Sequence, residues 1–142
     1  MIFSQPSFSQ VAPIKVVNEV LFHIQKKAYT SFDLKQFEII KSDVISQLDP
    51  AQQRILKGLS SYDVFVLYAI SQGEAEALDL NIESKDQVKF EQEKKPWKTG
   101  FWRANLYLQT KENLFVDRER FNSWFQMLKN KYDYFKKNSS LS

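Results

Sequence analysis

The chain of 142 residues contains no cysteine. This absence excludes structural disulfides, thiol nucleophiles, thiolate zinc sites and iron–sulfur ligation. It also fits a reducing compartment, so we expect a cytoplasmic protein that needs no metal and no cofactor. Glycine and proline are scarce, with three and four residues. All-β sandwiches and barrels need turn residues about every ten positions, and this shortage therefore favours helices.

Long apolar runs are missing too. The longest run, from Val64 to Ile70, falls far short of the roughly 18 residues that span a bilayer. The N-terminus lacks the basic start and the apolar centre of a secretory signal. We therefore expect no contact with a membrane.

Residues that could perform catalysis are few. The single histidine, His23, would need nearby carboxylates for acid–base catalysis or metal binding, and we interpret it as a residue beside the apolar face of a helix. Carboxylates such as Glu74 and Glu76 are two positions apart, which places them on different sides of a helix. No glycine-rich loop is present that could bind a nucleotide phosphate. We predict that the protein is not an enzyme.

The composition predicts a compact fold. With 43% apolar and 15% aromatic residues, the chain lies outside the class that stays disordered, and its length fits one domain. We expect a mainly α protein of five to six helices, with a single globular domain over residues 13–137, an extended arm before it (1–12) and a disordered tail after it (138–142). Its many Lys, Gln, Ser and Asn residues are typical of an AT-rich bacterial or phage genome.

Apolar spacing predicts two helices near the N-terminus. Apolar residues at positions 17, 20, 21, 24 and 28 repeat at helical spacing, which indicates a helix over residues 13–28. Thr30, with Asp33 three positions later, is typical of a helix cap. The second helix that it begins has apolar residues at positions 37, 40, 44 and 48 on one face.

A third helix begins with the clearest signal in the chain. Asp49 is a capping carboxylate, and Pro50 fits the first helical position because its missing N–H is not needed there. Gln52 is the residue expected to reach back to the cap. This helix is predicted to run to about Gly58.

The next segment is apolar at almost every position. Residues 62–70 fit a buried strand as well as a central helix, and we expect a helix that Ser60 or Ser61 caps and Gly73 ends. Residues 79–96 are rich in Asp, Asn, Glu, Lys and Gln and are the candidate linker.

Residues 101–109 alternate between two sets of side chains in a pattern that suits a strand with one wet face. With a turn at 111–113, they predict a β-hairpin over residues 101–116, which would make the fold α+β; a helix over 101–109 is the alternative. A final helix begins at Asp117, and its residues 121, 124, 125, 128, 132 and 135 form one narrow apolar seam.

The strongest functional signal is a basic, aromatic block at residues 94–137. It contains 11 basic and 4 acidic residues, a net charge of +7, together with all three tryptophans, whereas the remaining 9 basic and 13 acidic residues give −4. Charge of one sign steers an oppositely charged partner, and flat rings supply contact area. The candidate contact residues are Lys94, Lys95, Trp97, Lys98, Trp102, Arg103, Arg120, Met127, Lys131 and Tyr134.

We therefore expect a non-enzymatic binding protein, such as an adaptor, an accessory subunit or an immunity-type protein, that contacts an acidic protein partner through this block. The alternative is an accessory protein that binds nucleic acid, because lysines can follow a phosphate backbone while rings stack on bases.

Two short stretches resemble known families. Residues 48–59, which contain Asp49-Pro50, are similar to the capped helix that begins many winged-helix DNA-binding domains. Residues 124–127 and 133–135 resemble the closing helix of the psi subunit of the bacterial replicative clamp loader. Each likeness covers only a short stretch, and neither assigns a family.

Overall fold

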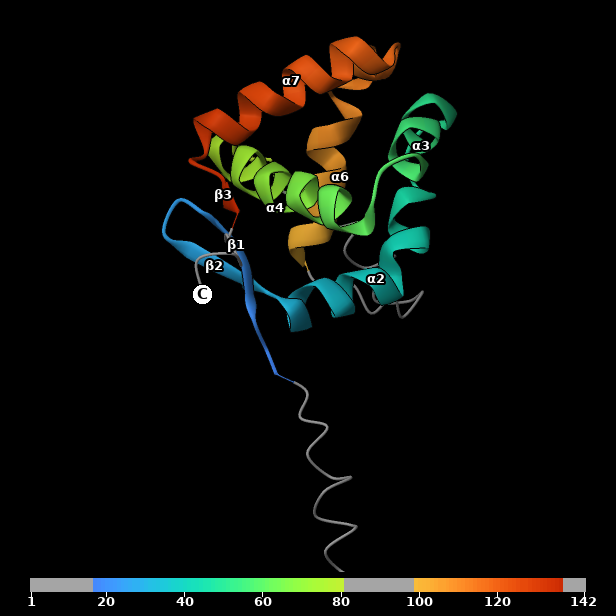
Figure 1. Ribbon diagram of the computed structural model, residues 1–142. Coiled ribbons are helices and arrows are strands. Elements are labelled where there is room, and N and C mark those ends of the chain that lie inside the picture. The colour runs from blue at the N-terminus through green and yellow to red at the C-terminus, as the bar shows by residue number, and fades with distance from the viewer. Residues whose placement is uncertain (1–16, 81–98, 137–142) are drawn as a thin grey trace, which may run out of the picture.

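The computed structural model of the chain describes residues 17–80 and 99–136 (Figure 1). Within these residues it contains five α-helices, one 3-10 helix and a small antiparallel sheet, so the predicted mainly α fold is confirmed. The elements are β1 (Val20–Ile24), β2 (Lys27–Thr30), α2 (Ser31–Ile45), α3 (Pro50–Lys57), α4 (Ser61–Ala77), α6 (Thr99–Gln109), the 3-10 helix η1 (Glu112–Phe115), α7 (Arg118–Lys131) and β3 (Phe135–Lys136). The expected arm, the expected tail and most of the expected linker lie outside the described residues.

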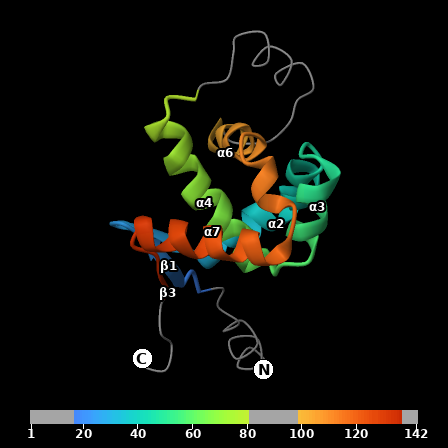
Figure 2. The ribbon, with the colours of Figure 1, turned by 90° about the horizontal axis from the view of Figure 1, so that it is seen from above.

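Helix α4 runs through the middle of the molecule. Figures 1 and 2 show α7 on one side of it and α2 on the other, with α6 crossing close by and the sheet at one end. Every residue of α4 from Val64 to Ser71 is buried, as expected for a helix that is apolar all round. None of the helices in the described ranges is both long enough and apolar enough to cross a membrane.

The predicted helix starts are confirmed at the level of single hydrogen bonds. Thr30 and Asp33 form a reciprocal capping box: the Thr30 backbone N–H donates to Asp33 Oδ2 at 2.9 Å, and the Asp33 N–H donates to Thr30 Oγ1 at 3.3 Å. Asp49, Ser60 and Asp117 cap α3, α4 and α7. Each such cap contributes about 1 kcal/mol, so local chemistry determines where these helices begin.

The predicted helix over residues 13–28 is wrong where the structure describes it. Residues 20–24 and 27–30 form a β-hairpin instead, with a turn that Gln25 makes at a φ of 56°. Apolar residues at 20, 21 and 24 suit both structures. Strand pairing prevails because Phe22 and Ile24 alternate with less buried neighbours, and because β3 pairs with the other side of β1 in the sheet order β2-β1-β3.

The hairpin predicted over residues 101–116 is also wrong: residues 99–109 are helix α6, and η1 follows in place of the expected turn and short partner strand. The strand prediction assigned Asn105 and Tyr107 to a wet face, yet both are buried. The α6 helix packs along α4. It therefore buries most residues of both alternating sets, with Arg103 and Leu106 half-buried, which a strand with one wet face could not do.

Gly73 does not end the fourth helix, because α4 continues to Ala77. The glycine is needed for close packing: a Cβ at Gly73 would lie 2.8 Å from Cε2 of Tyr132, the buried residue that follows α7. At this point the backbone of α4 and an aromatic ring are in direct contact. Only a residue without a side chain permits that approach.

Buried polar groups connect helices that are distant in the sequence. Gln52 was expected to reach back to its own cap, but its Nε2 donates instead to the carbonyl oxygen of Leu108 at 2.7 Å. Asn105 Nδ2 donates to the Val44 carbonyl at 3.0 Å, and Asn105 Oδ1 accepts from the hydroxyl of Tyr68. These bonds fix α6 against α2, α3 and α4 inside an apolar core.

Gly73 inside α4 and Gly58 at the end of α3 give a matched test of packing. We expect Gly73→Ala to lower the free energy of unfolding by about 1–2 kcal/mol, because the new methyl group displaces the Tyr132 ring from a filled site. Chemical denaturation at neutral pH measures the change.

Gly58→Ala is the control, since its Cβ would meet the end of the Arg118 side chain at 3.3 Å and the carbonyl oxygens of Ile55 and Arg54 at the ordinary contact distances of 3.4 and 3.8 Å. We expect a change within about 0.5 kcal/mol there. Equal effects of the two substitutions would contradict the proposed role of the Gly73 contact.

Candidate interaction surface

The structure separates the predicted contact residues. Lys94, Lys95, Trp97 and Lys98 lie outside the described residues. Trp102 is only 9% exposed and belongs to the core cluster, and Arg103 next to it is half-buried. The described part of α6 therefore presents no exposed indole to a partner.

Helix α7 closes the core through its predicted seam. Phe121, Trp124, Phe125 and Leu128 are buried, and so is Tyr132 just past the end of the helix. Phe135 was expected to continue this seam, but it lies on β3 and is 62% exposed. The helix ends at Lys131, and Asp133 adopts a φ of 53°, which turns the chain so that β3 can pair with β1.

A group of cations and rings lies along one edge of α7, and we call it the cation–aromatic patch. Its residues are Phe125 and Lys129 of α7, Tyr62 of α4, and Tyr134 and Lys136 after α7. The Lys129 ammonium lies 4.3 Å from the centre of the Phe125 ring and 5.4 Å from that of Tyr134. Lys136 lies 5.1 Å from the centre of the Tyr62 ring. Contacts of this kind contribute about 0.5–1 kcal/mol at exposed sites.

A hydrogen bond between two tyrosines fixes this patch. The hydroxyl oxygens of Tyr62 on α4 and Tyr134 before β3 are 2.7 Å apart. Burial is the main cause that raises the pKa of each of these hydroxyls. Both groups therefore stay neutral at physiological pH, and the charge of the patch comes from its lysines.

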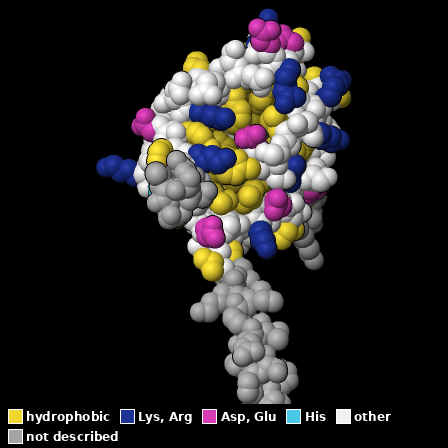
Figure 3. Space-filling model, in the orientation of Figure 1, with side chains coloured by type: hydrophobic (Ala, Val, Ile, Leu, Met, Phe, Trp, Pro, Cys, Tyr) yellow, Lys and Arg dark blue, Asp and Glu magenta, His cyan; other side chains and the backbone are white. Residues whose placement is uncertain are grey.

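One face of the molecule is mixed in character. Figure 3 shows hydrophobic side chains gathered across the middle of the face over α4, with Lys and Arg side chains among them and a few Asp and Glu. Apolar surface rimmed by polar groups is typical of an interaction site.

The opposite edge of α7 holds the other predicted contacts. Arg120 and Met127 are exposed, with Met127 at 54%. At about 100° per residue, Lys129 and Lys131 lie on opposite edges of the seam. The structure therefore places Tyr134 with Lys129 and Lys136, whereas Lys131 contacts Glu74 on the other edge.

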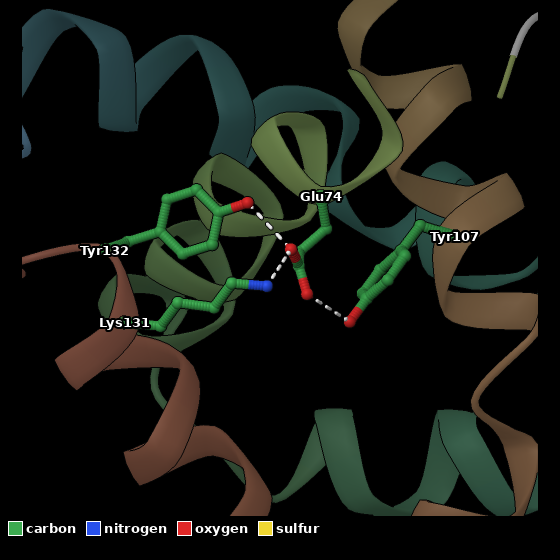
Figure 4. Close-up of polar contacts among 4 residues, drawn as sticks. All are labelled: Glu74, Tyr107, Lys131 and Tyr132. Carbon is green, nitrogen blue, oxygen red and sulfur yellow. Dashed lines mark hydrogen bonds and ion pairs between the residues drawn. The ribbon is translucent and has the colours of Figure 1, made fainter. Parts of the chain in front are cut away.

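Glu74 is a buried carboxylate that three donors hold (Figure 4). The Tyr107 hydroxyl donates to Oε1 at 3.0 Å. The Lys131 ammonium and the Tyr132 hydroxyl donate to Oε2 at 2.8 and 2.7 Å. One side chain of α4 thus connects α6 to the end of α7.

The electrostatics of this cluster keep the carboxylate charged. Burial by itself raises the pKa of Glu74, but the hydrogen bonds from its three donors outweigh burial, so the pKa lies below its ordinary value. Burial and the adjacent carboxylate raise the pKa of Tyr107 and of Tyr132. Their hydroxyls therefore remain donors at neutral pH, and the cluster acts as a structural connection between helices.

The spacing of Glu74 and Glu76 predicted only that the two carboxylates lie on different sides of a helix, and it did not indicate this cluster. Glu76 is exposed, but Glu74 is 7% exposed. One feature of the sequence could have indicated that Glu74 is buried: it follows the apolar residue Ile70 by four positions and so lies on the same side of the helix. The tyrosine pair had no signal, since 72 positions separate Tyr62 from Tyr134.

His23 lies on β1 instead of a helix, half-buried, with its ring 6.4 Å from that of Phe135. The interpretation of His23 as a residue beside the apolar face of a helix is therefore wrong, because residues 20–24 form a strand. Among the described residues, no group of three or more His, Asp and Glu side chains could hold a metal ion.

Comparison with known proteins gives no relative for this chain: no protein-family model, no curated protein and no solved structure matches it.

The buried carboxylate gives a prediction for stability. We expect Glu74→Gln to lower the free energy of unfolding at pH 7 by roughly 2–3 kcal/mol, because the amide leaves buried donors without their charged acceptor. The folded-state pKa is depressed, so the contribution of Glu74 is full above the unfolded value of roughly 4.3 and is lost as the pH falls through the folded-state pKa. Urea unfolding at pH 7 and at pH 3 should therefore show a smaller difference from the unmodified protein at pH 3.

Glu76→Gln removes an exposed carboxylate from the same helix and is the matched control, with an expected change within about 0.5 kcal/mol. If the two variants unfold alike at both pH values, Glu74 does not connect the helices as described.

Proposed function

We propose that the protein is a non-enzymatic binding protein, such as an adaptor, an accessory subunit or an immunity-type protein, that contacts an acidic protein partner through its basic aromatic C-terminal region. The observation that carries the proposal is the cation–aromatic patch. Its lysines lie over rings that fix their stems, so little side-chain entropy remains to be lost when a carboxylate binds.

The arrangement of the rings favours an acidic protein over nucleic acid. Base stacking needs open ring faces, but Trp102 and Trp124 are buried. The two tyrosine rings of the patch, Tyr62 and Tyr134, are half-buried, and each has a lysine ammonium over it. Carboxylates can bind these ammonium groups without displacing them, whereas bases would have to replace them.

A binding role also agrees with the state of the buried carboxylate. Glu74 already accepts bonds from Tyr107, Tyr132 and Lys131, so it has no role left as a general base for a substrate. We place this binding function in a bacterial cytoplasm, because a chain without cysteine suits a reducing compartment.

Defined polyanions test the proposal. We expect poly-L-glutamate to bind the unmodified protein, and the double variant Lys129→Glu/Lys136→Glu to bind it about tenfold or more weakly, because reversing the charge opposes the acidic chain. Fluorescence anisotropy with labelled polyglutamate measures the affinity. A single-stranded oligonucleotide in the same assay is expected to bind more weakly than polyglutamate.

The control is the double variant Lys35→Glu/Lys57→Glu, which changes the net charge equally through exposed residues of α2 and α3. If both double variants weaken binding alike, net charge and not the patch determines affinity. Tighter binding of the oligonucleotide, with a steep linear fall of log K against log salt, would favour nucleic acid as the partner.

A further inference from the structure

The outer edge of the sheet is open at β2. In the strand order β2-β1-β3, the strand β2 is an edge strand, and no described residue pairs with its outer side. Edge strands present unpaired N–H and C=O groups and can accept a further strand. The hairpin turn at Gln25 and Lys26 places Lys27 opposite Ile24 and Ala28 opposite His23. In an antiparallel pair, residues whose backbone groups bond to the neighbouring strand alternate with residues whose backbone groups point to the other side. Lys27 next to the turn bonds to β1, so the backbone N–H and C=O of Ala28 point away from β1.

A cavity of about 430 Å³ lies beside this edge. Ile40, Phe65 and Phe101 supply its apolar walls, and Lys27 and Tyr29 of β2 border it. The rings of Phe22 and Tyr29 are stacked, so Tyr29 and Lys27, two positions apart, belong to the face of the sheet that covers the core. The cavity therefore lies where the core continues past β2, and no strand of the described residues covers it there.

The charges at the rim are not equivalent. Asp33 is occupied in the capping box, where its Oδ2 accepts from the backbone N–H and the hydroxyl of Thr30. Lys27 lies over the face of the Tyr29 ring, with its ammonium 5.1 Å from the ring centre, and Lys26 beside it is exposed. The hairpin end of β2 therefore carries two lysines. Burial, Asp33 and Glu76 raise the pKa of Tyr29, so Glu76 of α4 also lies near this rim. Ile39 at the opposite rim is 82% exposed.

We propose that β2 accepts an extended segment of a partner protein as an additional strand, which inserts a large apolar side chain into the cavity and places a carboxylate next to Lys27. A strand added at the usual spacing of about 4.8 Å would lie over the cavity. Its backbone would pair with Ala28, and its alternate side chains would face the apolar walls, as in other complexes formed by strand addition. This surface shares no residue with the cation–aromatic patch, so the proposal goes beyond the function proposed above.

The test begins with selection from a display library of random peptides on the immobilised full chain. We expect enriched peptides to carry a large apolar residue close to Asp or Glu.

Fluorescence anisotropy with the purified protein and an enriched peptide should show at least a tenfold loss of affinity for Ala28→Pro. This change removes an outward N–H at an edge position where proline is tolerated. Lys27→Glu should weaken binding of the acidic peptide more than binding of its amide form, and Lys57→Glu on α3 should leave binding unchanged.

N-methylation of alternate backbone nitrogens of an enriched peptide tests the same pairing without altering the protein, so the test remains valid even if Ala28→Pro does not fold. Methylation at one set of alternate positions should abolish binding, while the other set is tolerated. The proposal is overturned if no peptide is enriched, or if enriched peptides tolerate both methylation patterns. It is also overturned if 2-naphthoate, an aromatic carboxylate, binds in a Lys27-dependent way while peptides do not, since the cavity would then hold a small molecule.

Discussion

The burial of α4 is the constraint on which the described fold depends. Its residues from Val64 to Ser71 are all buried, and burying one large apolar side chain contributes about 1.5–3 kcal/mol. No single neighbour can cover a helix that is apolar on every side, so α2, α6 and α7 each take a part of its surface. The rings of Phe22 and Phe65 connect the sheet to the same helix, 5.7 Å apart.

Polar contacts at the two ends of α4 then determine how the covering elements are oriented. Near its start, Tyr62 bonds to Tyr134 and so holds the chain that follows α7. Near its end, Glu74 bonds to Tyr107 of α6 and to Lys131 of α7. Apolar packing alone is non-directional. Directional bonds between buried groups therefore supply the specificity that fixes α7, and with it the positions of the lysines on both of its edges.

The accuracy of the sequence predictions follows the range of the interactions that decide each element. Helix starts at Thr30, Asp49 and Asp117 were predicted because a cap depends on residues three positions apart. The hairpin at 20–30 was missed, and the helix at 99–109 was only the alternative, because their apolar patterns suit two structures. Packing against α4 or pairing with β3 decides between the two. For the site, the basic character of α7 was visible in the sequence, but the burial of Trp102 and the pairing of Tyr134 with Tyr62 were not.

The sequence by itself determined the mainly helical composition, the helix caps, the apolar seam of α7 and the absence of cysteine chemistry, because these depend on residue type and local spacing. Only the tertiary structure decided which charged side chains are free. Lys131 and Glu74 bind each other across 57 positions, while Lys129 lies over the rings of Phe125 and Tyr134 on the other edge of the same helix. Two lysines two residues apart acquire different roles because a helix directs them to different neighbours, and those neighbours come from distant parts of the chain.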